Sequence, residues 1–151
     1  MTFFSYSYLF RAINTHVLLP QKLSGDLETD SSLVYQALAN GSCYIANDKL
    51  GKIKDFDFWL ANDHVRGVND HVRRCGQGEE ADLKTGDQLC WRMPERALAY
   101  LLRDGRIVSE ITAKDNRFPV TGPGVYRMEI VKPTLLFGHR PWIFSNAIYI
   151  R

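Results

Sequence analysis

Apolar and polar positions follow the spacing of β-strands over most of the chain after residue 42. Residues 125–131 alternate regularly, with apolar side chains on one face and charged side chains on the other, which is typical of a half-buried antiparallel strand. Short apolar or aromatic runs bounded by turn-forming residues predict further strands at residues 43–46, 56–61, 88–93 and 97–102. The closing run alternates more loosely and predicts a last, bulged strand at residues 142–150.

One turn in this region carries a strong local signal. Asp104 and Gly105 separate two strand-like segments, and such a pair favours the tight hairpin turn whose residues adopt positive φ. Roughly six or seven short strands, with a turn every ~8–12 residues, are typical of an immunoglobulin-like antiparallel β-sandwich. The string from Gly124 to Met128 resembles the tyrosine corner of such sandwiches, although Tyr126 in any buried antiparallel strand would give the same pattern.

The pattern before residue 42 is different. An apolar run at residues 16–19 predicts a short buried strand, and Pro20 ends it. Apolar residues at helical spacing predict a helix near residues 30–40, with Asp30 or Ser31 as the N-cap and Gly41 as the C-terminal stop. The sequence therefore predicts a strand and a helix ahead of a mainly β region.

A polar stretch without hydrophobic periodicity, residues 62–85, predicts a long exposed loop. It contains two copies of one string, Asn-Asp-His-Val-Arg, which start at Asn62 and Asn69. Carboxylate and imidazole groups are good ligands for divalent metals. A metal site also needs a closed shell of oriented ligands, which a flexible loop does not supply. We therefore interpret the repeat, with its residues Asp63, His64, Asp70 and His71, as a solvated loop.

Composition narrows the classes of function. The chain has 151 residues, of which 45% are hydrophobic and 24% charged, so it can bury one core. A net charge of +2 is too small to predict a nucleic-acid partner. The apolar stretches are shorter than the ~20 residues that span a bilayer, and the N-terminus lacks the basic region of a signal peptide. These features predict a soluble protein without a membrane partner, of unknown compartment.

Cysteine usage does not indicate a disulfide scaffold. The three cysteines form no CxxC pair, and their odd number leaves at least one thiol unpaired. Cys75 follows Arg73 and Arg74, and cationic neighbours can activate a thiol. Two arginines on a loop are more often simply solvated, which is the interpretation we prefer.

Five segments of the chain, in this order, resemble the C-terminal portion of proteins of the PHP (polymerase and histidinol phosphatase) superfamily, in its CehA/McbA-like metallohydrolase branch. The segments are Phe-Arg-Ala-Ile-Asn-Thr-His-Val-Leu-Leu from residue 10, Val-Tyr-Gln-Ala-Leu-Ala-Asn-Gly from residue 34, Leu-Leu-Arg-Asp-Gly from residue 101, Gly-Val-Tyr-Arg-Met-Glu from residue 124, and Arg-Pro-Trp-Ile-Phe-Ser-Asn from residue 140 with Ile148-Tyr149 after it. The last string is the most specific. Ala147 departs from the family pattern, which usually has proline there.

The resemblance implies a distorted barrel that binds two or three divalent metals and hydrolyses phosphoesters. Its metal ligands, an HxH pair, further His and acidic residues and a late Asp-x-His, lie upstream of the portion that this chain resembles. The four histidines here form no HxH, and no Asp stands two residues before any of them. We therefore expect no catalytic residue, metal ligand or cofactor in this chain, with divalent metals implied only for the parent barrel.

The resemblance also implies a domain division. Residues 1–48 would be the last strand and helix of the barrel, and residues 49–151 an accessory β-sandwich. The aromatic segment 1–10 is then expected to be a cut edge. Its partner would be the missing barrel or parent chain, or a second copy of this chain that associates through the same aromatic edge.

Three residues are candidate binding residues. His16 lies in an apolar run, where it would either face the mouth of the parent active site or sit in the core with a hydrogen bond to the backbone. Arg140 and Trp142 flank a proline; the arginine would either clamp an anion, stack on the indole ring, or simply pack the end of a strand.

Two functions follow. The first is a non-catalytic C-terminal part of a PHP-type metal-dependent phosphoesterase-like protein, which completes or covers the barrel. The alternative is a carbohydrate- or protein-binding β-sandwich module that uses exposed aromatic residues such as Trp59, Trp91 or Trp142.

Overall fold

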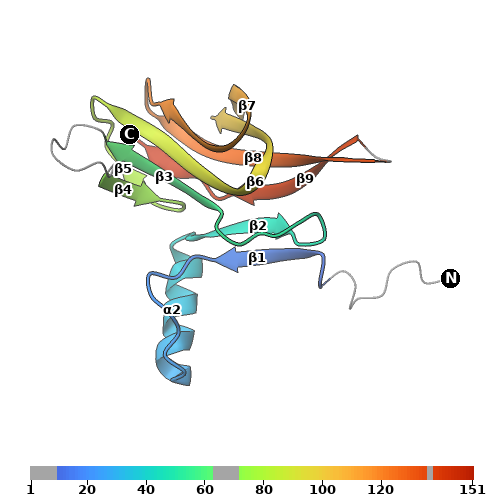
Figure 1. Cartoon of the computed structure of the whole chain (residues 1–151). Coiled ribbons are helices and arrows are strands. Elements are labelled where there is room, and N and C mark those ends of the chain that lie inside the picture. Colours follow the sequence, from blue (N-terminus) through green and yellow to red (C-terminus); the bar gives the residue numbers. More distant parts are fainter. Residues whose placement is uncertain (1–9, 63–71, 136–137) are drawn as a thin grey trace.

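The computed structural model describes residues 10–62, 72–135 and 138–151, and these residues form a mainly antiparallel β-fold with one helix (Figure 1). The elements are β1 (Ile13–Val17), α2 (Leu27–Ala39), β2 (Cys43–Asn47), β3 (Asp57–Asn62), β4 (Val72–Gly76), β5 (Glu80–Ala81), β6 (Asp87–Arg103), β7 (Arg106–Pro119), β8 (Gly124–Thr134), β9 (Gly138–Ser145) and β10 (Ile148–Ile150). The predicted mainly β class is confirmed. Within the described residues, no helix is both long and apolar enough to cross a bilayer.

Hydrogen bonds join all ten described strands into one sheet. Its main order is β1-β2-β9-β8-β6-β3-β4; β7 pairs with β6, and β10 lies between β8 and β5. Every strand pair is antiparallel except β10 with β5. Because β2 pairs with β9, strands from both sides of residue 48 belong to the same sheet. The division into residues 1–48 and 49–151 therefore coincides with no break in the sheet, and it stays a prediction.

The long strand β6 pairs with strands on both of its sides along the sheet. Its first part, up to Arg92, pairs with β3, and its second part, from Leu98, pairs with β8. The register of β6 against β7 shifts between Arg92 and Ala97, where Pro94 cannot donate a backbone hydrogen bond. Both parts of the strand supply side chains to one core, with Leu89 and Trp91 from the first and Leu101 from the second.

The core confirms the alternation seen in the sequence. Tyr126, Met128 and Ile130 of β8 are at most 1% exposed, whereas Arg127 and Glu129 on the opposite face pair with each other at 2.6 Å. The predicted hairpin is also present: Asp104 and Gly105 have φ of 50° and 79° and join β6 to β7. These local patterns were sufficient because each depends only on residues close together in the chain.

Helix α2 exists, but the predicted N-cap was wrong. The helix begins at Leu27, and the carboxylate of Asp26 caps it by accepting a hydrogen bond from the Thr29 N–H at 2.9 Å. The Asp30 carboxylate instead accepts hydrogen bonds from the backbone N–H groups of Ser24 and Gly25, both at 2.8 Å, and so fixes the loop before the helix. Gly41 follows the helix with a φ of 69°, as predicted for a C-terminal stop.

Three further predictions of local structure need correction. Strand β1 is half-exposed, because it is the last strand at one end of the sheet order. The predicted loop at residues 62–85 contains β4 and β5, and Cys75 and Gln77 within it are buried. The predicted last strand is two strands, β9 and β10, because the chain leaves β9 after Ser145 and pairs elsewhere.

Candidate functional site

His16 is held in a small polar cluster on β1. Its Nε2 atom lies 2.9 Å from Oδ1 of Asp48, whose other oxygen accepts a hydrogen bond from Asn14 at 2.6 Å. The imidazole ring also stacks on Tyr44, with 4.9 Å between ring centroids. The side chains of His16 and Asp48 are each 31% exposed. His16 is thus neither in the core nor bonded to the backbone, and a carboxylate from the β2–β3 loop fixes its ring.

Arg140 and Trp142 both lie on β9, but the cation over the indole ring is a different residue. The ammonium group of Lys132, on β8, lies 3.8 Å from the ring centroid of Trp142 and donates to the Leu50 carbonyl at 2.8 Å. Burial lowers the pKa of Lys132, because the charged form loses hydration. Trp142 is 1% exposed and belongs to the core, whereas Arg140 is exposed.

A small, mainly apolar pocket of about 300 Å3 is lined by Arg140 and Trp142. Ile13 and Ile45, which are 64% and 47% exposed, line it from β1 and β2. The structure therefore brings two of the three predicted binding residues to one pocket. His16 does not line it.

The cysteines and tryptophans form fewer reactive or exposed sites than the sequence suggested. All three cysteines are free thiols, and burial raises the pKa of Cys75 to about 11, so this thiol stays protonated near neutral pH. Trp91 and Trp142 are each 1% exposed, and the prediction that they are exposed was wrong. Trp59 is half-buried, with the Arg73 guanidinium 5.9 Å from its ring centroid.

Helix α2 presents an uncovered apolar face. It extends away from the sheet (Figure 1), and Ala37 is its only buried residue. Leu27, Tyr35 and Leu38 are 82%, 72% and 42% exposed. At 3.6 residues per turn these three side chains lie within about a quarter of a turn of one another. We call them the outer face of α2.

The helix is attached to the sheet mainly at its C-terminal end, through polar contacts of Asn146. The side-chain amide of Asn146 donates to the Gly41 carbonyl at 2.8 Å, and its backbone N–H donates to Oε1 of Gln77 at 3.0 Å. Gly78 donates its N–H to the Ala147 carbonyl at 2.7 Å, which brings the turn after β4 against the same point. We call these four residues, with Ala147, the α2 clamp. The clamp contains Asn146, the last residue of the most specific resembling string.

A cleft of about 660 Å3 lies on another side of α2 and is the largest hollow that we describe. Leu33 and Ala37 of α2 and Phe56 before β3 supply apolar lining. Charged side chains from the sheet and its loops also line it; these are Asp55, Asp57, Arg73, Glu79 and Arg92. Asp57 pairs with Arg73 at 2.7 Å, and Arg92 pairs with Asp115 at 3.2 Å.

Gln77 also lines the cleft and is 1% exposed. Its Oε1 must face the N–H of Asn146, and its Nε2 has no hydrogen-bond partner within the described residues. An unpaired buried donor typically costs about 1–3 kcal/mol. The ring nitrogens of Trp91 and Trp142 are buried in the same way without a partner among the described residues, so the unpaired amide of Gln77 does not by itself mark a binding site.

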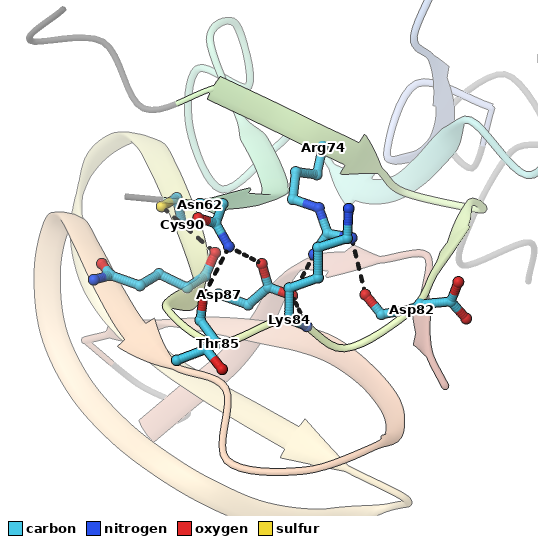
Figure 2. A network of polar contacts seen from close by, with 8 residues as sticks. Asn62, Arg74, Asp82, Lys84, Thr85, Asp87 and Cys90 are labelled. Carbon is cyan, nitrogen blue, oxygen red and sulfur yellow. Dashed lines mark hydrogen bonds and ion pairs between the residues drawn. The ribbon is translucent and has the colours of Figure 1, made fainter. Parts of the chain in front are cut away.

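A separate polar network closes the end of the sheet where β3, β4 and β6 meet (Figure 2). The buried Asp87 carboxylate accepts hydrogen bonds from Asn62 at 2.7 Å, from the Lys84 N–H at 2.8 Å and from Arg74. Arg74 also donates to the Asp82 carbonyl at 2.9 Å. Three protein donors already occupy the Asp87 carboxylate, so we assign this network to stability.

Sequence reasoning missed the cleft, because part of its polar lining comes from one misread segment. Arg73, Gln77 and Glu79 all lie in the stretch predicted to be an exposed loop. A buried glutamine has no sequence signature, since its partner Asn146 is distant in the chain. Two acidic residues flank Phe56 in the Asp-Phe-Asp string, which is a local signal for part of the lining.

Among the described residues, no three His, Cys, Asp or Glu side chains are grouped so that they could hold a metal ion. Asp63, His64, Asp70 and His71 lie outside the described residues, as does the aromatic segment before Phe10. No protein-family model, curated protein or solved structure matches the chain.

Proposed function

We propose that this chain is the non-catalytic C-terminal part of a PHP-type metal-dependent phosphoesterase-like protein, and that it completes or covers the barrel. The outer face of α2 carries the proposal. A helix of 13 residues is marginal in water unless an apolar face is buried, yet three large apolar side chains of α2 are exposed. A barrel packed on this face would bury them.

The α2 clamp supports the same arrangement. Its hydrogen bonds hold the C-terminal end of the helix at one place on the sheet, so the helix is positioned without being covered. In this proposal β1 and α2 are the last strand and helix of the barrel, and the clamp holds α2 at a fixed place on the accessory domain. Divalent metals belong to the barrel.

The accessory domain is, in this proposal, an immunoglobulin-like sandwich. The Tyr126 hydroxyl donates to the Gly122 carbonyl at 2.8 Å, and a hydrogen bond from a tyrosine to the backbone a few residues upstream is the defining contact of a tyrosine corner. The two parts of β6 pair with different strands and share one core, as a sandwich requires.

Metal content and turnover test the proposal. The 151-residue chain, purified with Mn, Zn and Fe supplied, is expected to bind no stoichiometric metal and to leave a generic phosphodiester intact, because the predicted ligands lie upstream. Bound metal measured by mass spectrometry, together with turnover that a chelator removes, would contradict it. The coding sequence upstream is expected to encode HxH and Asp-x-His, and a frame without them would also count against the proposal.

A further inference from the structure

Strand β7 has one edge without a partner strand. Its 14 residues, Arg106–Pro119, pair with β6 along the other edge, and no further described strand pairs with β7. An unpaired edge presents main-chain N–H and C=O groups that can pair with an additional strand. Figure 1 shows β7 at the opposite end of the molecule from α2. The free edge is therefore remote from the outer face of α2.

The middle of β7 lacks the usual protection of a free edge, which is a proline, a bulge or an inward-pointing charge. The only proline of β7 is its last residue, and both register shifts against β6 lie outside residues 109–113. Burial alternates from residue 109 to residue 114, as in a regular strand. The half-buried side chains are uncharged; these are Ser109, Ile111 and Ala113. The exposed side chains are Glu110, Thr112 and Lys114.

This segment is complementary to a second copy of itself. Antiparallel pairing around Thr112 sets Glu110 of each chain opposite Lys114 of the other, while Ile111 faces Ala113. Opposite charges directly across two strands stabilise a sheet, and so do threonine pairs. The paired positions are an even number of residues apart, so their main-chain groups point to the same edge, as an antiparallel ladder requires. The exposed charges thus attract a second copy in this register.

Neither charge has a partner within one chain. Glu110 and Lys114 are four positions apart on one strand, which separates them by about 13 Å. Neither takes part in an ion pair within the described residues. We propose that two copies of this chain associate through β7, antiparallel around Thr112, and so form a symmetric dimer with one continuous sheet.

The inference goes beyond the covering function and does not depend on it. The dimer uses β7 and leaves the outer face of α2 free for a barrel. A chain that hydrolysed phosphoesters would contradict the proposed function and leave the dimer proposal standing. A chain without self-association would contradict the dimer alone.

Sedimentation equilibrium of the 151-residue chain at about 5–500 µM tests the proposal. One strand pair is smaller than a standard interface of ~1,600 Å2, so we expect a reversible dimer with a Kd of about 10–100 µM. Lys114→Glu replaces two attractive cross-strand pairs by two repulsive ones and should raise the Kd about tenfold or more. A chain that is monomeric throughout this range, or a Kd that Lys114→Glu leaves unchanged, would overturn the proposal.

Lys22→Glu is the matched control for this variant. It changes the net charge by the same amount at an exposed position before α2, outside β7. The Kd of this variant should therefore stay within about twofold of the parent value. Equal weakening in the two variants would mean that net charge, and not the β7 edge, controls the association.

A mixture of two variants tests the register. Glu110→Lys places lysine at both positions 110 and 114 of one chain, and Lys114→Glu places glutamate at both, so each variant alone repels a second copy of itself. In an equimolar mixture every lysine at these positions faces a glutamate of the other chain. We expect a heterodimer whose Kd is within about threefold of the parent value, which also shows that both variants fold. A mixture that associates no better than either variant alone would refute the pairing around Thr112.

Discussion

Asp87→Ala is expected to lower the free energy of unfolding by about 3–5 kcal/mol, which is the usual cost of removing one partner from a buried ion pair. The Asp87 side chain is 0% exposed and that of Arg74 15%, so the alanine variant leaves a nearly buried guanidinium without its carboxylate. The Asn62 amide and the Lys84 N–H lose the same acceptor (Figure 2). Chemical denaturation followed by fluorescence measures the change.

The same carboxylate makes stability depend on pH. Burial alone raises the pKa of Asp87, but hydrogen bonds from Arg74, Asn62 and the Lys84 backbone outweigh it and leave the pKa below the ordinary value of 3.8. A lowered pKa in the folded state means that the contribution is fully present above pH 3.8 and is lost as pH falls through the folded pKa. The acid limb of the stability curve should therefore be shallower in Asp87→Ala.

Asp115→Ala is the matched control for this prediction. Asp115 also pairs with an arginine, Arg92, but the two side chains are 57% and 63% exposed. Exposed pairs contribute about 0–1 kcal/mol, so this variant should be close to the parent chain. Equal losses of unfolding free energy in the two variants would show that the buried network stabilises the fold no more than an exposed ion pair does.

Gly78→Ala is expected to cost about 2–5 kcal/mol through two effects. The residue has a φ of 85°, which an L side chain adopts at a cost of about 1–2 kcal/mol. Its new Cβ would also overlap the backbone of Asn40 and Gly41 at the end of α2, and overpacking typically adds about 1–3 kcal/mol. The α2 clamp would have to open to relieve the overlap.

Gly105→Ala separates the two effects. Gly105 has a similar φ of 79°, but an added Cβ there would have nothing within 4 Å. Only the conformational cost of about 1–2 kcal/mol is expected. Thermal unfolding of both variants, with the circular dichroism of the helix recorded separately, compares them. A Gly78→Ala chain as stable as Gly105→Ala would mean that the close approach at the clamp is not required.

What the sequence predicted correctly was encoded within a few neighbouring residues. The β6–β7 hairpin depends on Asp104-Gly105, and the buried face of β8 depends on alternation over seven positions from Val125. The helix was also found, although Asp26 rather than Asp30 caps it, because both aspartates lie where an N-cap is plausible and only the loop geometry separates them.

What could not be predicted depends on contacts between distant residues. Strand β5 has two residues and exists because it pairs with β10, about 70 positions later in the chain. Gln77 is buried because Asn146 reaches it, 69 positions away, and no local pattern distinguishes it from a surface glutamine. The candidate cleft depends on these same contacts, whereas Arg140 and Trp142, which the sequence did propose, line a smaller pocket.

Hydrogen exchange of α2 in the 151-residue chain tests the central claim most directly. If the outer face of α2 is covered only by a barrel, the backbone amides of this helix should exchange far faster than those of β8 in the isolated chain. Local opening of α2 would then expose little further apolar surface. Protection of α2 equal to that of β8 would contradict the account, since the helix would then need no cover.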